Sequence, residues 1–421
     1  MIKVLAAIVA PPHLNVSGAG RAAEQLSIAL AQHCDITIAS MMGAQIREAE
    51  QSEICRVPVT VGLPPFLPWR HVPNRYRTLF YGSDISEMVR SGSFDLVHLH
   101  NPMPALEMAR IARACRGAGV PYVVSTHGFN EIAHGARIYG FGRLRRLVWQ
   151  ALVTRPVQQA VRGAAAVLGL SPADREIVDT MGFAGSFAVV PNGVPMPGPF
   201  DASEDSAICV RLGVPARRRG ELTCMFLANH TPNKGLPVLL EAFDGLTCPY
   251  TLIVGGEKRA EIDYALASLT RRADQRIIVT GRLSDRQVQA LFRRSDLFVF
   301  PTLADTFPLV VLEAMSHGVP VLASRVGGIP HQLDQACGQL VEPGNVRQLR
   351  DAVSVFAHRP EMLLQMGQRA KNRVARHFTW ENAAKRAFAE YEQALAAPSR
   401  APATALPAFS ASHALQRGTR A

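Results

Sequence analysis

Short apolar runs alternate with longer segments of mixed polarity along most of the 421-residue chain. A run of consecutive apolar residues is typical of a strand that is buried on both faces of a parallel sheet. In the first half these runs are Val4–Val9, Ile36–Ala39, Leu96–Leu99, Tyr122–Ser125, Ala166–Leu170 and Ala188–Val190. The segments after two of them predict helices, one from Gly18 to Gln32 and one around Pro104–Arg116. This alternation predicts repeated βαβ units.

The same alternation restarts after an interruption near the middle of the chain. Residues 196–220 are rich in Pro, Gly, Ser and charge, so we interpret them as an interdomain linker. The later strands are expected at Thr223–Leu227, Tyr250–Val254, Ile277–Thr280, Leu297–Phe300 and Val319–Ala323. Because 421 residues exceed one ordinary hydrophobic core, two domains are expected. The predicted fold class is therefore α/β, with two Rossmann-like doubly wound domains.

These patterns also suggest domain bounds. We place an N-terminal domain at residues 1–195 and a C-terminal domain at residues 221–377. An amphipathic helix over residues 378–396 begins at Phe378-Thr379-Trp380. Residues 397–421 consist largely of Ala, Pro, Ser and Arg without a core pattern, so we expect a disordered tail there.

Composition narrows the class of protein. The hydrophobic fraction of 48% is that of a soluble globular chain, and no apolar run reaches transmembrane length. Met1-Ile2-Lys3 leads straight into the first strand, which differs from a signal peptide. The seven cysteines lack C-x-x-C spacing, so we expect reduced core thiols rather than a zinc site. Together these features predict a cytoplasmic protein.

The formal net charge of +11 indicates an anionic partner. No acidic residue occurs between Glu131 and Asp174, whereas six arginines do. Aromatic and aliphatic residues interleave with four of them over Arg137–Trp149, a pattern that predicts peripheral docking on the anionic inner face of a membrane. A helix with merely solvated arginines is the alternative. Phe66–Tyr81 could share that surface. Nothing resembles a nucleic-acid-binding module, so no nucleic-acid partner is expected.

The clearest candidate chemistry lies in residues 298–330, FVFPTLADTFPLVVLEAMSHGVPVLASRVGGIP. A strand leads into a polar loop that carries Asp305, and a helix is expected from near Phe307, with Glu313 about two turns into it. A helix N-terminus offers unpaired N–H groups and a positive dipole end to a phosphate. Acids beside a phosphate site suggest recognition of sugar hydroxyls, so a nucleotide sugar is the expected ligand. The alternative is two solvated acids.

Two further segments could contact phosphate. Gly18 and Gly20 nearly match the dinucleotide fingerprint, but their loop is too long and Ser40-Met41 replaces the expected acid after the second strand. We therefore interpret them as a looser phosphate loop. Lys234 and Gly235 end the loop Ala228–Gly235 at a helix start, where an ammonium group can reach a diphosphate. The alternative is an ordinary surface lysine.

These motifs resemble a known family. Asp305-x(7)-Glu313, the following E-A-M-x-x-G-x-P-V and the later G-G-I-P are similar to the retaining nucleotide-sugar glycosyltransferases of the GT-B fold, glycosyltransferase family 4. The family usually has E-G-F-G-x(4)-E, so Asp305 and Pro308 are departures. Proline within the first helical turn removes one possible phosphate donor and leaves Leu309 and Val310. The resemblance implies a C-terminal helix that crosses back onto the first domain.

The resemblance also implies roles for individual residues. Lys234 and Gly235 match G-R-x(4)-K-G, in which Arg and Lys hold the diphosphate, but Ala228-Asn229 replaces Gly-Arg. Asn229 carries no charge, so either another basic residue substitutes, with Arg282 and Arg325 as candidates, or donor binding is weaker. His127, in Thr126-His127-Gly128 after a strand, matches the histidine that contacts the transferred sugar. His98 and His100 end the preceding strand, and His100 is a weaker candidate.

The resulting hypothesis is a retaining, metal-independent glycosyltransferase with no cofactor besides its UDP- or GDP-linked co-substrate. It would move a hexosyl unit to a glycan or lipid-linked acceptor in surface polysaccharide biosynthesis. The candidate catalytic residues are His127, Asp305 and Glu313; the candidate donor-binding residues are Gly18, Gly20, Asn229, Lys234, Gly235, Arg282, Phe307, Leu309, Val310 and Glu313; no metal ligands are expected.

Two alternatives stay open. Asn229 and Asp305 would also suit a catalytically impaired homologue that serves as a binding or scaffold subunit. A sugar-nucleotide epimerase or a phosphorylase on the same fold is the other. The sequence shows neither the acids that an epimerase needs nor the further phosphate pocket that a phosphorylase needs.

Overall fold

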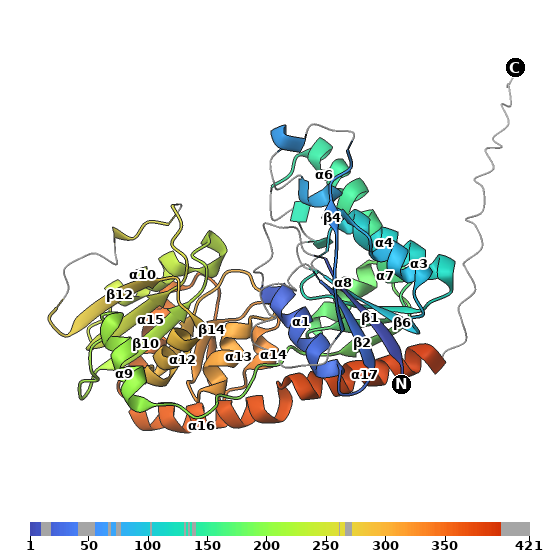
Figure 1. Ribbon diagram of the computed structural model, residues 1–421. Coiled ribbons are helices and arrows are strands. Elements are labelled where there is room, and N and C mark those ends of the chain that lie inside the picture. Colours follow the sequence, from blue (N-terminus) through green and yellow to red (C-terminus); the bar gives the residue numbers. More distant parts are fainter. Residues whose placement is uncertain are drawn as a thin grey trace, which may run out of the picture.

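The computed structural model describes residues 1–9, 18–40, 55–65, 69–72, 77–101, 103–129, 132–133, 135–136, 140–260, 262–265 and 272–396. It contains two α/β domains side by side, and the two C-terminal helices run along one side of both (Figure 1). The expected disordered tail, residues 397–421, lies outside the described residues, as do residues 10–17.

The first domain is built on a parallel sheet in the order β3-β2-β1-β6-β7-β8-β9. Its strands are β1 (Lys3–Ile8), β2 (Asp35–Ser40), β3 (Cys55–Pro58), β6 (Leu96–His100), β7 (Tyr122–Ser125), β8 (Ala166–Gly169) and β9 (Ser186–Val189). The strand order reverses between β1 and β6, and ligands of open parallel sheets bind at such a switch point. A short antiparallel pair of β4 (Val61–Gly62) and β5 (Gly82–Ser83) forms a separate two-stranded sheet.

Helices cover both faces of this sheet because side chains alternate along each strand. Val4 and Ala6 of β1 pack in the cluster that includes α1 (Gly18–Leu30) and the last helix, α17 (Trp380–Ala396). Leu5 and Ala7 belong to the opposite cluster. The helices on that side are α3 (Ile85–Ser91), α4 (Ala105–Ala118) and α7 (Arg155–Arg162). The domain also contains η3 (Trp69–His71), η4 (Thr78–Phe80), α6 (Arg143–Trp149), which passes through the π-turn η5 (Gln150–Thr154) into α7, and α8 (Ala173–Thr180).

The second domain repeats the architecture with the parallel order β12-β11-β10-β13-β14-β15. Its strands are β10 (Leu222–Leu227), β11 (Tyr250–Gly255), β12 (Gln275–Gly281), β13 (Leu297–Phe300), β14 (Val321–Ser324) and β15 (Gly338–Val341). Its helices are α9 (Ala202–Arg211), η6 (Pro232–Lys234), α10 (Leu236–Asp244), α12 (Asp285–Arg294), α13 (Leu309–Ser316), α14 (Ile329–Gln332), α15 (Val346–Ala357) and α16 (Pro360–His377). The order reverses between β10 and β13, so their following loops define the second switch point.

The C-terminal helix crosses back onto the first domain, as the fold prediction requires. Ala384, Ala387 and Tyr391 of α17 are buried in the first domain's core. The crossing point is tight, because a Cβ on Gly193 would lie 2.2 Å from the backbone nitrogen of Trp380. The two-domain α/β prediction is therefore confirmed (Figure 1).

Three local features differ from the expectation. Residues 196–220, interpreted as a linker, contain α9, whose N-cap Asp201 accepts hydrogen bonds from the backbone of Ser203 and Glu204. Strands β3 and β15 were not foreseen. Helix α13 begins at Leu309, with Pro308 as its N-cap. Glu313 is thus the fifth helical residue, little more than one turn in, and the expected two turns are wrong. The domain bounds themselves stay predictions.

Two further findings concern the cysteines and the helices. Six of the seven cysteines are buried and Cys55 is exposed, and all are free thiols. In the described parts of the chain, each helix is too short or too polar to cross a bilayer.

Candidate functional site

Lys234 and Asp305 form an ion pair at the switch point of the second domain. Lys234 ends the short helix after β10, and Asp305 lies in the loop after the neighbouring strand β13. The Lys234 Nζ atom is 2.6 Å from Asp305 Oδ2. The two side chains are 25% and 15% exposed, so the pair is only partly screened by water. The structure therefore brings together a cation and an acid that the sequence placed in separate motifs.

Asn233 holds the two loops together, and sequence analysis missed it. Its backbone oxygen accepts hydrogen bonds from Leu303 N at 2.7 Å and Thr302 Oγ1 at 3.0 Å. Its side-chain amide donates to Ala304 O at 3.3 Å. Asn233 precedes Lys234 and Ala304 precedes Asp305 in the chain. These hydrogen bonds therefore hold together the two loops that carry the ion pair.

Two glycines permit this close packing of loops. Gly235 has φ 74°, and a Cβ there would lie 1.9 Å from Pro301 O. Gly327 has φ 52°, and its Cβ would lie 2.0 Å from Asp305 O. Any other residue would force the backbone apart at either position. The fold therefore requires glycine at position 235 whether or not a ligand binds there.

The start of α13 adjoins Asp305. Asp305 Oδ1 accepts a hydrogen bond from Thr306 N at 3.0 Å, and Gly328 N donates to Thr306 O at 2.6 Å. Leu309 and Val310 are the first two helical residues and are partly exposed, so their amides are suited to an anion. Phe307 differs: its side chain is 4% exposed and packs on Phe378, so only its backbone could contact a donor.

Glu313 lies where the two domains meet. Burial raises the pKa of its carboxyl group, the positive charge of Arg21 lowers it and Asp285 raises it. Arg21, in the first turn of α1, forms an interdomain ion pair with Asp285 at 3.2 Å. The start of α1, which carries Gly18 and Gly20, thus faces the region of Glu313. A Cβ on Gly18 would meet no atom within 4 Å, so packing alone does not require that glycine.

His127 reaches the same region from the first domain. Among the described residues it is the one non-glycine with positive φ, 35°, a strained conformation that is enriched at functional sites. A Cβ on the next residue, Gly128, would lie 3.0 Å from Thr306 Oγ1 across the domain boundary. His127 is 9% exposed, and burial lowers its pKa to about 4. Its imidazole is therefore neutral near pH 7.

Three further residues predicted to bind the donor follow strands of the second domain. Asn229 is exposed after β10, while the adjacent His230 is buried and its Nδ1 lies 2.7 Å from the Tyr264 hydroxyl. Arg282 is exposed after β12, two strands from β10, which corresponds to about 10 Å. Arg325 pairs with Glu342 at 3.3 Å.

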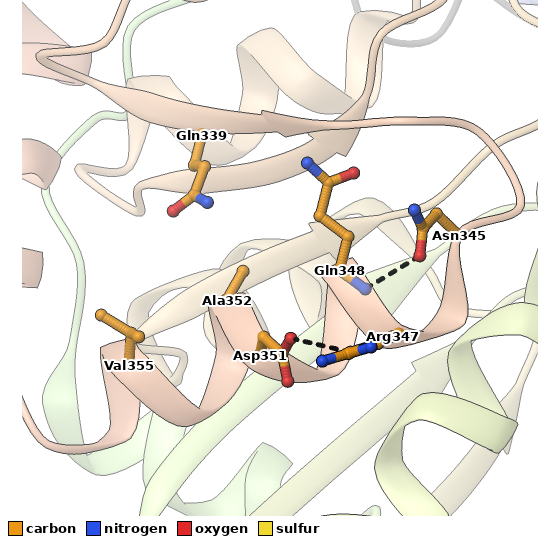
Figure 2. Close-up of a pocket in the computed structure, with 7 residues that line it drawn as sticks. All are labelled: Gln339, Asn345, Arg347, Gln348, Asp351, Ala352 and Val355. Atoms are coloured by element: carbon orange, nitrogen blue, oxygen red, sulfur yellow. Dashed lines mark hydrogen bonds and ion pairs between the residues drawn. The ribbon is translucent and has the colours of Figure 1, made fainter.

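A separate surface hollow of about 400 Å³ lies along α15 (Figure 2). Its lining side chains come from β15, α15 and the turn between them, and include the i,i+4 ion pair of Arg347 and Asp351 at 3.8 Å. It contains none of the predicted site residues.

Two parallel-sheet domains with loops meeting across a boundary define the GT-B class of glycosyltransferase architecture. Over 93% of this chain and 98% of the other, the structure matches sucrose-phosphate synthase from Thermosynechococcus elongatus with a TM-score of 0.67 at 19% identity. Anabaena HepE, solved in complex with UDP and glucose, matches over 93% of this chain and 100% of its own with a TM-score of 0.68 at 17% identity. These likenesses show the fold.

Sequence comparison identifies the family. Residues 16–196 match the model "Glycosyltransferase Family 4", and residues 214–373 match "Glycosyl transferases group 1". TuaC of Bacillus subtilis, named as a teichuronic acid biosynthesis glycosyltransferase, is 28% identical over 63% of this chain and 61% of its own length. D-inositol 3-phosphate glycosyltransferase of Mycobacteroides abscessus is 28% identical over 72% of this chain and 67% of its own. The chain belongs to glycosyltransferase family 4.

Proposed function

We propose that this protein is a retaining, metal-independent glycosyltransferase that moves a hexosyl unit from a nucleotide-diphosphate sugar to a glycan or lipid-linked acceptor. The observation that carries the proposal is the Lys234–Asp305 pair beside the start of α13, with the His127 loop opposite it. A cation, helix amides and an acid in one place match a diphosphate that is joined to a sugar.

In this proposal the donor rearranges the ion pair. A diphosphate brings at least two negative charges, so it competes with Asp305 for Lys234. Lys234 and the amides of Leu309 and Val310 then stabilise charge on the leaving nucleoside diphosphate. Asp305, no longer paired, accepts hydrogen bonds from sugar hydroxyls. Glu313 accepts hydrogen bonds from the nucleotide ribose.

The transfer step requires no enzyme-linked intermediate in this account. The acceptor oxygen forms its bond to the anomeric carbon on the face from which the diphosphate oxygen leaves. The acceptor's proton passes to the departing diphosphate, which balances the reaction. His127 orients the sugar from the first domain, so the two domains must be close for the reaction to proceed.

The nucleotide is proposed to be UDP or GDP, and the pathway to be surface polysaccharide biosynthesis. HepE has been solved with UDP-glucose, and TuaC is named for teichuronic acid biosynthesis. Both facts concern those proteins and support the proposal by similarity. Arg282 lies roughly two strand spacings from Lys234's loop, so Lys234 is assigned as the main cation for the diphosphate.

Helix α6 supports the proposed membrane partner. Leu144, Leu147 and Val148 are 75%, 62% and 48% exposed, and their i, i+3, i+4 spacing places them on one face. Arg143, Arg145 and Arg146 are exposed on the same helix. Uncovered apolar side chains with arginines beside them suit the headgroup region of an anionic bilayer. In Figure 1, α6 lies at the opposite end of the first domain from α17. Residues 137–139 lie outside the described residues.

A turnover assay tests the proposed activity. Purified protein is incubated with UDP-glucose, UDP-galactose or GDP-mannose and membrane extract, with and without EDTA, and nucleotide release is followed. We expect release from one donor that EDTA does not reduce, and an α-linked product by NMR. Donor binding without release from any donor would favour the scaffold alternative. A β-linked product from an α-linked donor would contradict retention.

A further inference from the structure

Three histidines and a tyrosine form a buried row in the first domain, behind the proposed sugar site. His98 and His100 lie on β6, His127 follows β7, and Tyr391 comes from the crossing helix α17. Their exposed fractions are 0%, 1%, 9% and 0%. The proposed function uses only His127, so the other three need a separate explanation.

His98 is held from two sides. Its Nδ1 lies 2.7 Å from the Tyr391 hydroxyl, and its Nε2 lies 2.7 Å from Ser125 Oγ. Its ring centroid is 3.8 Å from that of His100. Burial lowers the pKa of His98 to about 3, and it lowers the pKa of His100 as well. The row therefore consists of neutral rings whose hydrogen bonds, rather than charges, determine their orientation.

His100 contacts His127 directly. The distance from His100 Nδ1 to His127 Nε2 is 3.1 Å, and the rings are stacked with an interplanar angle of 26°. A hydrogen bond between two neutral imidazoles contains one proton, so one nitrogen donates and the other accepts. The tautomer of His127 is thus coupled to that of His100.

The positions of the two unpaired nitrogens favour one arrangement. His100 Nε2 and His127 Nδ1 are both buried and have no hydrogen-bond partner among the described residues. If His127 donated, its own Nδ1 would be a bare acceptor and the unpaired N–H would be at His100, which is 1% exposed. If His100 donates, the unpaired N–H is at His127, which is 9% exposed and lies beside the domain boundary, where movement of the two domains can bring a ligand oxygen to it. A buried N–H that stays unsatisfied is costly, so the arrangement that places it at the boundary is favoured.

We propose that His100 is a positioning residue that donates from Nδ1 to His127 Nε2, so that His127 presents an Nδ1–H donor to a sugar hydroxyl. His98, held by Tyr391 and Ser125, supports His100 through the contact between their rings. The crossing helix α17 thereby contributes to the orientation of a side chain in the site. The role assigned to the sugar rests on the proposed function, whereas the tautomer does not.

Two substitutions of His100 separate hydrogen bonding from packing. In His100→Asn, the amide can occupy the place of Nδ1 and donate to His127. In His100→Gln, the amide reaches toward the place of Nε2 and leaves His127 Nε2 without its donor. Both remove the imidazole that contacts the ring of His98, so a merely structural role predicts similar defects in the two variants.

The first readout is the tautomer of His127. Long-range ¹H–¹⁵N correlation spectra of histidine-¹⁵N-labelled full-length protein, assigned with His127→Gln, distinguish protonated from bare ring nitrogens. We expect Nδ1–H for His127 in the wild type and in His100→Asn, and a mixture of tautomers in His100→Gln. Tyr391→Phe should alter the signals of His98. A wild-type Nε2–H tautomer, or a His127 spectrum unchanged in His100→Gln, would overturn the proposal.

The second readout is donor turnover, with UDP-glucose as the first probe and the other donors of the panel after it. We expect His100→Gln to lower kcat by about tenfold or more with little change in KM, because the nucleotide contacts are intact. His100→Asn should stay within about threefold of the wild type. Equal losses of kcat in both variants would show that His100 acts only through packing. Absence of turnover in the wild type would refute the proposed function, while the spectra would still decide the tautomer.

Discussion

Lys234 Nζ and Asp305 Oδ2 are 2.6 Å apart although 71 positions separate them in sequence. Each is the residue of its loop best suited to one half of a nucleotide sugar, the cation for phosphate and the acid for hydroxyls. Without a donor the two neutralise each other. In the proposed function, the two groups that recognise the donor are held together as an ion pair until a donor binds.

The ion pair predicts coupled effects of substitution. Lys234→Ala and Asp305→Asn should each lower donor affinity by about ten- to a hundredfold, because each removes a charge-assisted hydrogen bond to ligand. A double-mutant cycle on urea unfolding should give a coupling free energy of about 1 kcal/mol for the partly buried pair. Additive effects on stability would show that the pair does not form in solution.

Substitution of Gly235 should destabilise the protein more than substitution of Gly213, a glycine with the same φ. Gly235 and Gly213 both have φ 74°, but a Cβ at Gly213 would meet nothing within 4 Å. Gly213→Ala should therefore cost only the backbone strain of about 1 kcal/mol. Gly235→Ala should cost about 2 kcal/mol more and abolish donor binding, since Pro301 O must move. Equal unfolding free energies for the two variants would contradict this explanation.

Glu313 predicts a pH-dependent stability difference. Burial raises the pKa of its carboxyl group above the usual 4.5, so the folded protein holds this proton more tightly than the unfolded chain does. Its destabilising contribution is absent below pH 4.5 and grows as pH rises through the folded-state pKa. The unfolding free energy of Glu313→Gln should therefore increase relative to that of the wild type as pH rises. The exposed Glu392→Gln serves as control, and parallel profiles for all three proteins would refute the prediction.

Helix α6 predicts binding to anionic vesicles. Leu144→Ser with Leu147→Ser should lower co-sedimentation with phosphatidylglycerol vesicles by about tenfold, because two exposed leucines lose their apolar contact with the bilayer. Replacing Arg143, Arg145 and Arg146 by Gln should weaken binding by about 1 kcal/mol per arginine. Leu364→Ser, at an equally exposed leucine on α16, should change nothing. Equal binding to neutral phosphatidylcholine vesicles would contradict the role of the arginines.

Much of the fold was predictable because buried parallel strands appear as apolar runs. The strand Tyr122–Ser125 matches β7 residue for residue. Helix α9 was hidden by the polar composition around it, although Asp201 before Ser203 and Glu204 is a helix-start signal. The start of α13 was misplaced because Pro308 suits both the cap and the first turn.

The candidate site was predictable only where a residue type implies its chemistry. Lys234 and Asp305 carry charges in loops that follow strands, whereas Asn233 acts largely through its backbone oxygen. The contact of His100 with His127 depends on the register that pairs His100 with Ser125 in the neighbouring strand. That register, which sequence periodicity does not contain, also explains why His100 was only a weak candidate.

Thermal shift with a panel of UDP-, GDP-, ADP- and dTDP-sugars tests the central claim most directly. A donor at a hundred times its dissociation constant should stabilise the fold by about 2.7 kcal/mol. We expect stabilisation with the sugars of one base, UDP or GDP, its loss in Lys234→Ala, and its retention in Lys371→Ala, an exposed lysine on α16. No shift with any donor at high concentration, or an equal shift in Lys234→Ala, would contradict the donor site.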